Sequence, residues 1–381
     1  MADMIERYLQ ELIRQSTPDR TAWNVEKIRQ GAEITWNYID GCMLTALIAM
    51  TEISGDDRYA AFAEQVGDYF VQEDGSILTF RPEKRTLDDF NESRILFPLL
   101  RRTGKDKFRK AAEQQYRTLS EQPRTYEGNF WHKLIYPDQV WLDGAYMALP
   151  FMAMYQRELG DGDYSDIAGQ LRTIRKRMRD PATGLYYHGY DASRKAFWAD
   201  PETGLSRNFW LRADGWFACA LADLAEIIPA EKPERAEIAE MLAELMESAA
   251  KYMDPETGMY WQVMDQGGRE GNYPETSGSA MMAFAMLKGA RLGVLDSRFR
   301  DLGRKTFTGI TEGFLTVRDG MPELTNICLG AGLGPEKNRR RDGTYEYYIS
   351  EPVVANDAKG AAPFVLAYTE IRRMQVSGLR G

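Results

Sequence analysis

The chain has 381 residues, of which 44% are hydrophobic and 28% charged, a composition typical of soluble globular proteins. Its 57 acidic and 48 basic residues give a net charge of −9, which argues against nucleic acid or an anionic membrane as the main partner. The three cysteines, Cys42, Cys219 and Cys328, are far apart and odd in number, so we expect no disulfide framework. No metal-ligand spacing occurs, and the sequence predicts neither a metal nor a cofactor.

The first predicted element is an amphipathic helix over residues 1–15, where apolar residues recur every three to four positions between charged ones. Its acidic residues and broken apolar pattern are unlike a signal peptide. No run approaches the roughly 18 apolar residues of a membrane span. We therefore expect a cytoplasmic protein with no membrane partner; the sequence predicts no oligomeric state.

Further along the chain, two kinds of helix alternate. Helices of the first kind carry charges between their apolar positions, which is typical of a surface helix. Helices of the second kind are apolar nearly all round and rich in small residues, which is typical of a buried helix. The predicted surface helices after the first are 59–72, 108–122, 164–178, 235–253 and 300–314. The predicted buried helices are 41–53, 93–103, 143–156, 214–228, 277–290 and 358–371.

Six surface helices alternating with six buried ones predict a closed ring of helical hairpins. A small residue or Asn stands near the start of each buried helix, at Gly41, Asn91, Gly144, Gly215, Gly278 and Gly360. The fold class is therefore all-α, an (α/α)6 toroid, and we expect one domain over residues 1–381. The turns DPATG (180–184) and DPETG (254–258) predict short β-hairpin loops at the rim.

In such a ring the buried helices begin at one rim, and the preceding loops line a central funnel. Trp and Tyr residues gather beside carboxylates in most of these segments, as sugar binding requires: flat apolar faces for stacking, and acids for hydroxyl groups or catalysis. The funnel segments are 36–41, 86–91, 140–147, 210–217, 273–281 and 349–360.

Several long stretches resemble the unsaturated rhamnogalacturonyl hydrolases, glycoside hydrolase family 105, which are related to the unsaturated glucuronyl hydrolases of family 88. The resemblance runs from about Trp36 to the C-terminus. It is carried by FWHKLIYPDQVWLDGAYM, GLYYHGYD, ADPETGLSRNFWLRADGWF, ETSGSAM and YEYYISEPVVANDAKG. It implies the six-hairpin toroid and removal of a 4,5-unsaturated galacturonyl residue from lyase-generated rhamnogalacturonan oligosaccharides.

The resemblance also implies roles for particular residues. The Asp of the WLDG motif falls on Asp143 as catalytic acid and base, and the Asp of the LDxxN motif falls on Asp88 as its assistant. Substrate contacts are implied for Trp141, His188, Trp210, Arg212 and Trp216, with His132 beside them. The chain departs from the usual family pattern around the arginine, with Leu211 before it and Asp214 two residues after it.

The implied reaction is a hydration rather than a direct glycosidic displacement. An acid protonates C4 of the unsaturated uronate, water adds at C5, and the resulting hemiketal opens and expels the aglycone. One carboxyl group can act as the acid and then as the base. Because Trp141 and Tyr146 flank Asp143 and Asp88 is a second carboxylate, we expect a raised pKa at Asp143.

Other interpretations of these residues remain open. Asp143 could cap a helix or pair within the ring, and Arg212 could pair with Asp214 or Glu275. Only one of Asp88 and Asp89 is expected to face the funnel, since they are adjacent. The alternative functions are an unsaturated glucuronyl hydrolase, a sugar 2-epimerase and a noncatalytic glycan-binding protein; the two histidines are too few for the epimerase.

Overall fold

Six helices with extensively buried faces form the inside of the molecule in a computed structural model that describes residues 2–376. Their sequences are rich in Ala, Met, Leu and Phe. The Ala positions allow close approach of neighbouring helices, and the larger side chains fill the core. These inner helices are α3 (Tyr38–Ser54), α5 (Leu96–Thr103), α7 (Leu142–Glu158), α9 (Leu211–Ile227), α11 (Thr276–Arg291) and α14 (Ala358–Val376).

A second set of six helices covers the inner ones, each with an apolar face inward and charged residues outward. The outer helices are α1 (Ala2–Arg14), α4 (Asp57–Phe70), α6 (Asp106–Ser120), α8 (Ser165–Met178), α10 (Pro233–Ala249) and α12 (Arg298–Phe314). Every predicted surface and buried helix corresponds to one of these twelve. The all-α class and the six-hairpin toroid are therefore confirmed.

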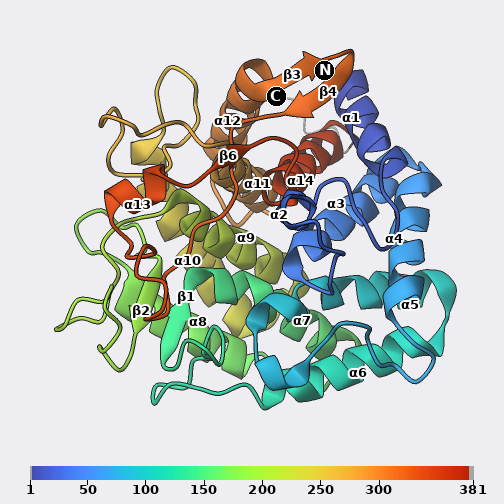
Figure 1. The fold of residues 1–381 in the computed structure, drawn as a ribbon, viewed down its shortest axis with the longest axis horizontal. Helices are drawn as coiled ribbons and strands as arrows, with labels where there is room; N and C mark the ends of the chain where they lie inside the picture. The colour runs from blue at the N-terminus through green and yellow to red at the C-terminus, as the bar shows by residue number, and fades with distance from the viewer. Residues whose placement is uncertain (1, 377–381) are drawn as a thin grey trace.

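The ring closes between the two ends of the described chain. The chain runs from blue α1 to red α14 in Figure 1, and α14 packs against α3 to complete the inner circle. Arg372 Nη1 donates to Glu6 at 3.2 Å, which joins α14 to α1. The arrangement gathers all six inner-helix starts at one end of the ring and all six inner-helix ends at the other.

Two glycines near the inner-helix starts are required by close packing. A Cβ on Gly41 would lie 2.5 Å from the Cα of Glu92, in the next hairpin. A Cβ on Gly278 would lie 2.3 Å from Leu211 Cγ. Neither position has room for a side chain, so these glycines let neighbouring hairpins meet at the rim.

The β structure is short and lies in the rim loops. Strand β1 (Gln139–Trp141) pairs with β2 (Gly189–Asp191). The other two antiparallel pairs are β3 (Leu315–Arg318) with β4 (Met321–Leu324), and β5 (Ile327–Cys328) with β6 (Val353–Val354).

The predicted turns form, with one difference in pairing. At 180–184 the carboxylate of Asp180 accepts from the backbone N–H of Thr183 at 2.7 Å, and Gly184 takes a left-handed φ of 77°. The same Asp–Thr bond recurs in the turns 200–204 and 254–258. The difference is that strand β2 pairs with the distant β1 on one edge and bridges Leu205 on the other, whereas the turn at 180–184 is closed by a bridge between Arg179 and Tyr186.

Short helical segments complete the loops around the rim. They are α2 (Val25–Gln30), α13 (Tyr345–Ile349) and the 3-10 turns η1 (Pro82–Lys84), η2 (Leu87–Phe90), η3 (Glu92–Ile95) and η4 (Ala250–Tyr252). All three cysteines are free and buried. Among the helices within residues 2–376, none is long and apolar enough to cross a membrane.

Candidate active site

A cavity of about 310 Å³ opens at the end of the ring where α3 and α7 begin. Its walls come from loops 24–37, the first turn of α3, η2, residues 132–147, and part of segment 330–341. The lining includes both carboxylates assigned from the sequence, Asp88 and Asp143, together with His132 and Trp141.

Pairing of the strands β1 and β2 places a histidine beside Asp143. Trp141 stands opposite Gly189 in the register, and the N–H of Leu142 donates to the carbonyl of His188 at 3.2 Å. As a result His188 Nε2 lies 3.2 Å from Asp143 Oδ2. On its other side, His188 Nδ1 lies 2.7 Å from the hydroxyl of Tyr348.

This histidine reverses the expected electrostatics of Asp143. Burial by itself would raise the pKa of the Asp143 carboxyl, but the His188 ring beside it, with a smaller contribution from His132, holds that pKa below its usual value. The sequence-based expectation of a raised pKa is therefore wrong for the unliganded protein. The neighbouring aromatic rings were visible in the sequence, whereas His188 is brought in by the fold.

A second loop contact positions Asp88. The N–H of Leu87 donates to the carbonyl of His132 at 3.0 Å, which sets η2 beside the 132–136 loop. Lys133 Nζ then lies 2.5 Å from Asp88 Oδ2, and His132 Nε2 lies 3.7 Å from Asp88 Oδ1. Burial lowers the pKa of His132 to about 4, so its ring is neutral at pH 7 and Lys133 is the cationic partner of Asp88.

The adjacent carboxylate, Asp89, does not line the cavity. Its Oδ1 accepts a long hydrogen bond of 3.5 Å from the side chain of Asn37. Burial, together with the nearby charge of Asp88, raises the pKa of Asp89 to about 7. Of the two adjacent acids, Asp88 therefore faces the cavity.

Three stacked rings form one wall of the site. The ring of Trp141 stacks on His132, with centroids 4.4 Å apart, and on Tyr136, with centroids 4.8 Å apart. Gly144 makes room beneath the stack, since a Cβ there would lie 3.2 Å from His132 Nδ1. The motif in which Gly144 follows Asp143 thus combines an acid facing the cavity with space for the His132 ring.

Four of the predicted contact residues are buried and do not line the cavity: His188, Trp210, Arg212 and Trp216. The ring of Trp210 is 4.7 Å from His188, and Trp216 stacks on Tyr146 at 4.9 Å. Arg212 is 1% exposed. Their contact with substrate stays a prediction.

The surroundings of Arg212 exclude the two alternative ion pairs. Its Nη1 donates to Ser277 Oγ at 3.0 Å and to the carbonyl of Cys328 at 2.6 Å. Glu275 instead caps α11 by accepting from the N–H groups of Ser277 and Gly278. Asp214 accepts from the backbone of a different neighbour, Tyr186.

The funnel is therefore less symmetric than the sequence predicts. Segments 210–217, 273–281 and 349–360 contribute nothing to the cavity lining. The segment from Cys328 to Tyr348 covers the first of these: the Cys328 carbonyl meets Arg212, and the Tyr348 ring stacks on Trp210 with centroids 5.9 Å apart.

Sequence reasoning missed four residues at or beside the site: Lys133, Tyr136, Arg341 and Tyr348. Lys133 and Tyr136 lie in the same motif as His132, and this closeness in sequence could have predicted them as site residues. Arg341 lies in a loop of consecutive arginines that reads as a solvated charge run. No ion pair joins Arg341 to a carboxylate in the described part of the chain.

A ring of six helical hairpins with two carboxylates and a stacked aromatic wall in one funnel defines a carbohydrate-active toroid. Comparison with known proteins identifies the family. A model described as Glycosyl Hydrolase Family 88 matches residues 10–375, and the chain belongs to this family. Within residues 2–376, no cluster of three or more His, Cys, Asp and Glu side chains is arranged for a metal ion.

Three similar proteins refine this placement. A family 105 glycoside hydrolase from C. acetobutylicum ATCC 824 is 38% identical, with a TM-score of 0.87 over 95% of this chain and 99% of that one. Protein Atu3128 of Agrobacterium fabrum is 39% identical over 59% of this chain and 97% of its own length. Unsaturated rhamnogalacturonyl hydrolase YesR of Bacillus subtilis is 30% identical over 50% of this chain and 54% of its own length. The resemblance to family 105 is confirmed, and the protein is a glycoside hydrolase of the family 88 and 105 type.

Proposed function

We propose that the protein removes the 4,5-unsaturated galacturonyl residue from oligosaccharides that a lyase has cut from rhamnogalacturonan, a component of pectin. The similarity to the unsaturated rhamnogalacturonyl hydrolase of Bacillus subtilis supports this substrate. The observation that carries the mechanism is the unequal environment of the two cavity carboxylates, Asp143 beside His188 and Asp88 beside Lys133.

Direct glycosidic displacement generally uses two carboxyl groups in matched roles, one as acid and one as base or nucleophile. Here Lys133 Nζ lies within ion-pair distance of Asp88, and this pairing suits electrostatic support better than proton donation. Within residues 2–376 no Lys or Arg pairs with Asp143, and its carboxylate lies beside the ring of His188. This division favours a reaction with one acid–base group.

An unsaturated uronate provides such a reaction because its C4=C5 bond is a vinyl ether. Asp143 gives a proton to C4, and the positive charge at C5 is shared with the ring oxygen. Water then adds at C5 and returns a proton to Asp143. The hemiketal at C5 opens to a ketone, the former ring oxygen becomes a hydroxyl on C1, and C1 expels the aglycone as an alcohol.

Asp143 must be protonated for the first step although its pKa is lowered in the unliganded protein. Substrate binding corrects this in two ways. It displaces water from the cavity, and it brings the uronate carboxylate near Asp143; both effects raise a carboxyl pKa. His188 keeps its ring beside the acid, because its Nε2 lies 3.2 Å from Asp143 Oδ2 while its Nδ1 lies 2.7 Å from the hydroxyl of Tyr348.

Recognition of the uronate carboxylate is assigned to Arg341, with Arg212 as the partner implied by the family resemblance. Arg341 lines the cavity and has no ion pair within the described chain, whereas Arg212 lies beneath segment 328–348 and already donates to Ser277 and Cys328. A guanidinium group suits a carboxylate because it can donate two parallel hydrogen bonds. The aromatic wall that includes Tyr136 and Trp141 provides the apolar surface for the sugar.

The test is an assay of lyase-made disaccharides that follows the ultraviolet absorbance of the conjugated double bond. We expect loss of absorbance in step with release of rhamnose from the unsaturated galacturonyl disaccharide. In water enriched with heavy oxygen, the label should enter C5 of the uronate product. A saturated uronide should be inert, because it has no alkene to protonate.

Two outcomes would overturn different parts of the proposal. Label at C1, or rapid cleavage of the saturated uronide, would establish direct displacement in place of hydration. A higher kcat/KM for an unsaturated glucuronyl disaccharide of the glycosaminoglycan type would reassign the substrate and leave the mechanism in place. No activity on any unsaturated uronide would reject both.

A further inference from the structure

A line of three side chains runs from the active-site cavity into the protein. It begins at Asp143, whose Oδ2 lies 3.2 Å from His188 Nε2, and it ends at Tyr348, whose hydroxyl lies 2.7 Å from His188 Nδ1. His188 and Tyr348 are both fully buried. The mechanism proposed above uses the carboxyl group at one end of this line and leaves the hydroxyl at the other end without a role.

The two oxygens of Asp143 have different surroundings. Oδ2 is buried, and so is His188 Nε2; within residues 2–376 neither atom has another hydrogen-bond partner. The Asp143 side chain as a whole is 14% exposed and lines the cavity. Oδ1 is therefore the carboxyl oxygen that a substrate can reach, and Oδ2 is the one that His188 can reach.

The hydroxyl of Tyr348 determines which nitrogen of His188 carries the hydrogen. A neutral imidazole has one N–H donor and one bare nitrogen acceptor, and the bond made by one nitrogen fixes the role of the other. In the described part of the chain, His188 Nδ1 is the only hydrogen-bond partner of this hydroxyl. Burial raises the pKa of Tyr348 well above its usual value, so the hydroxyl keeps its proton.

Only one direction of this hydrogen bond satisfies every buried donor. If Nδ1 carried the hydrogen and donated it to Tyr348, the buried O–H would have no acceptor, which is unfavourable away from water. If instead the hydroxyl donates to Nδ1, the ring hydrogen lies on Nε2 and points toward Asp143 Oδ2. Each of the two donors then has an acceptor.

We propose that Tyr348 is a positioning residue that holds His188 as the Nε2–H tautomer and thereby places the catalytic proton of Asp143 on Oδ1. Because Nε2–H donates to Oδ2, the protonated acid carries its hydrogen on the oxygen that faces the sugar. The opposite tautomer would present a bare Nε2, which would accept a proton held on Oδ2 and keep it away from C4. The catalytic consequence rests on the proposed hydration reaction, whereas the tautomer does not.

The kinetic test is Tyr348→Phe, which removes only the hydroxyl. We expect kcat for the unsaturated disaccharide to fall roughly two- to tenfold, as for loss of one neutral hydrogen bond, with KM unchanged because Tyr348 does not line the cavity. The matched control is Tyr345→Phe on the same helix, α13, where the hydroxyl donates to the carbonyl of Glu270 at 2.8 Å. This control should keep the parent kcat. An unchanged kcat in Tyr348→Phe, or an equal loss in both variants, would overturn the proposal.

The second test observes the tautomer directly and needs no substrate. The chain has only two histidines, so ¹⁵N NMR of the imidazole rings at pH 8 can be assigned readily. Asp143→Asn replaces the carboxyl by a neutral amide that can either accept from Nε2–H or donate to a bare Nε2. We expect the Nε2–H tautomer of His188 in this variant. Addition of Tyr348→Phe should populate the Nδ1–H tautomer.

Each NMR outcome decides the question. The Nδ1–H tautomer in Asp143→Asn alone would mean that Tyr348 accepts rather than donates, and this single variant carries the test if the double variant fails to fold. Equal tautomer populations in the single and double variants would show that Tyr348 does not set the tautomer. Lack of activity on every unsaturated uronide would reject the proposed function and leave the NMR result standing, so the two failures are distinguishable.

Discussion

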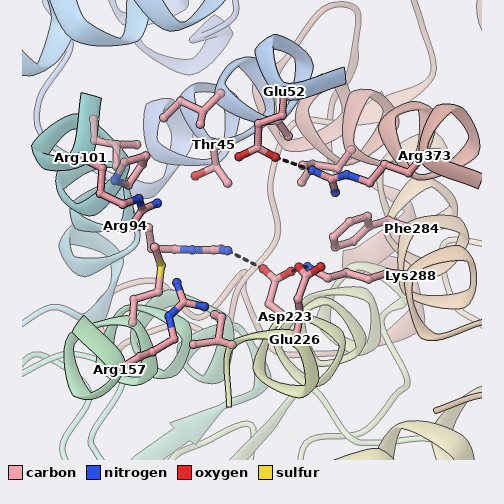
Figure 2. A pocket seen from close by; sticks show the side chains of 17 residues that line it. Thr45, Glu52, Arg94, Arg101, Arg157, Asp223, Glu226, Phe284, Lys288 and Arg373 are labelled. Atoms are coloured by element: carbon pink, nitrogen blue, oxygen red, sulfur yellow. Dashed lines mark hydrogen bonds and ion pairs between the residues drawn. The ribbon is translucent and has the colours of Figure 1, made fainter. Parts of the chain in front are cut away.

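The two ends of the helical ring are built from the same six inner helices, yet they differ in chemistry. The funnel at the helix starts is walled by stacked rings, including Trp141 and Tyr136, and it holds two carboxylates. The cavity at the helix ends, of about 300 Å³, has one aromatic residue in its lining, Phe284, and a network of Arg, Lys, Asp and Glu, as Figure 2 shows. Of these two cavities in the described residues, only the first has a wall of stacked aromatic rings.

The direction of the helices accounts for part of this difference. Helix N-termini carry partial positive charge and C-termini partial negative charge. The funnel therefore favours an anionic substrate even though the whole chain has a net charge of −9. The opposite end favours cationic side chains, and there Asp223 acts to hold two of them in place.

The largest expected effect is a loss of turnover at the funnel, with the stability of the protein kept. Asp143→Asn should reduce turnover by roughly 10²–10⁴-fold, because one group acts as acid and base. The protein should remain folded and should still bind the unsaturated disaccharide. Initial rates from the double-bond absorbance, with binding measured by calorimetry, check this. Near-normal turnover would remove Asp143 from the mechanism.

The corresponding change at the other end should act on stability. Asp223→Asn removes the carboxylate that Arg94 and Lys288 share and leaves both charges buried. We expect a loss of about 3–5 kcal/mol in the free energy of unfolding, measured by urea denaturation, with turnover per folded molecule largely kept. A loss below about 1 kcal/mol would show that the network relaxes or hydrates at little cost.

Substitution of Asp89 should instead increase the free energy of unfolding. Burial and the charge of Asp88 raise the pKa of this carboxyl to about 7. The folded state then holds a proton that the unfolded chain releases near pH 4, so this group reduces stability as pH rises from about 4 to 7. Asp89→Asn should remove that loss and stabilise the protein at pH 8, by up to about 4 kcal/mol.

The pH dependence provides the check on Asp89. Unfolding free energies measured from pH 4 to 8 should show a flatter profile in Asp89→Asn than in the parent protein. The adjacent variant Asp88→Asn serves as the matched control, and it should lower activity instead, because Asp88 lines the cavity and binds Lys133. Parallel pH profiles for the parent and Asp89→Asn would contradict the assignment.

The smallest expected effect compares one arginine from each end. Arg341→Gln should raise KM for the unsaturated uronate about tenfold with little change in kcat, because it removes a charge-assisted hydrogen bond to the substrate. Arg157→Gln, at the far cavity, should leave KM unchanged. Equal effects of the two variants on KM would mean that KM depends on the net charge of the protein and not on a contact between Arg341 and the substrate.

Much of this molecule could be predicted from the sequence. Hydrophobic periodicity is a local property, so the twelve ring helices were predictable to within a few residues, and their alternation predicted the toroid. The WLDG and LDxxN motifs identified Asp143 and Asp88 before any geometry was known. The sequence placed Gly41 and Gly278 near the starts of buried helices. It did not predict that Glu92 and Leu211 lie too close to these positions for any side chain.

Only the tertiary structure decided the electrostatic partners of these acids. His188 reaches Asp143 through the β1–β2 pairing, and Lys133 reaches Asp88 through the contact between η2 and the 132–136 loop. Segment 328–348 covers Arg212 and leaves Arg341 at the cavity. A pKa depends on charges within a few ångströms, whichever part of the chain supplies them. Local pattern determines helices, whereas the packing of distant loops determines which charges meet.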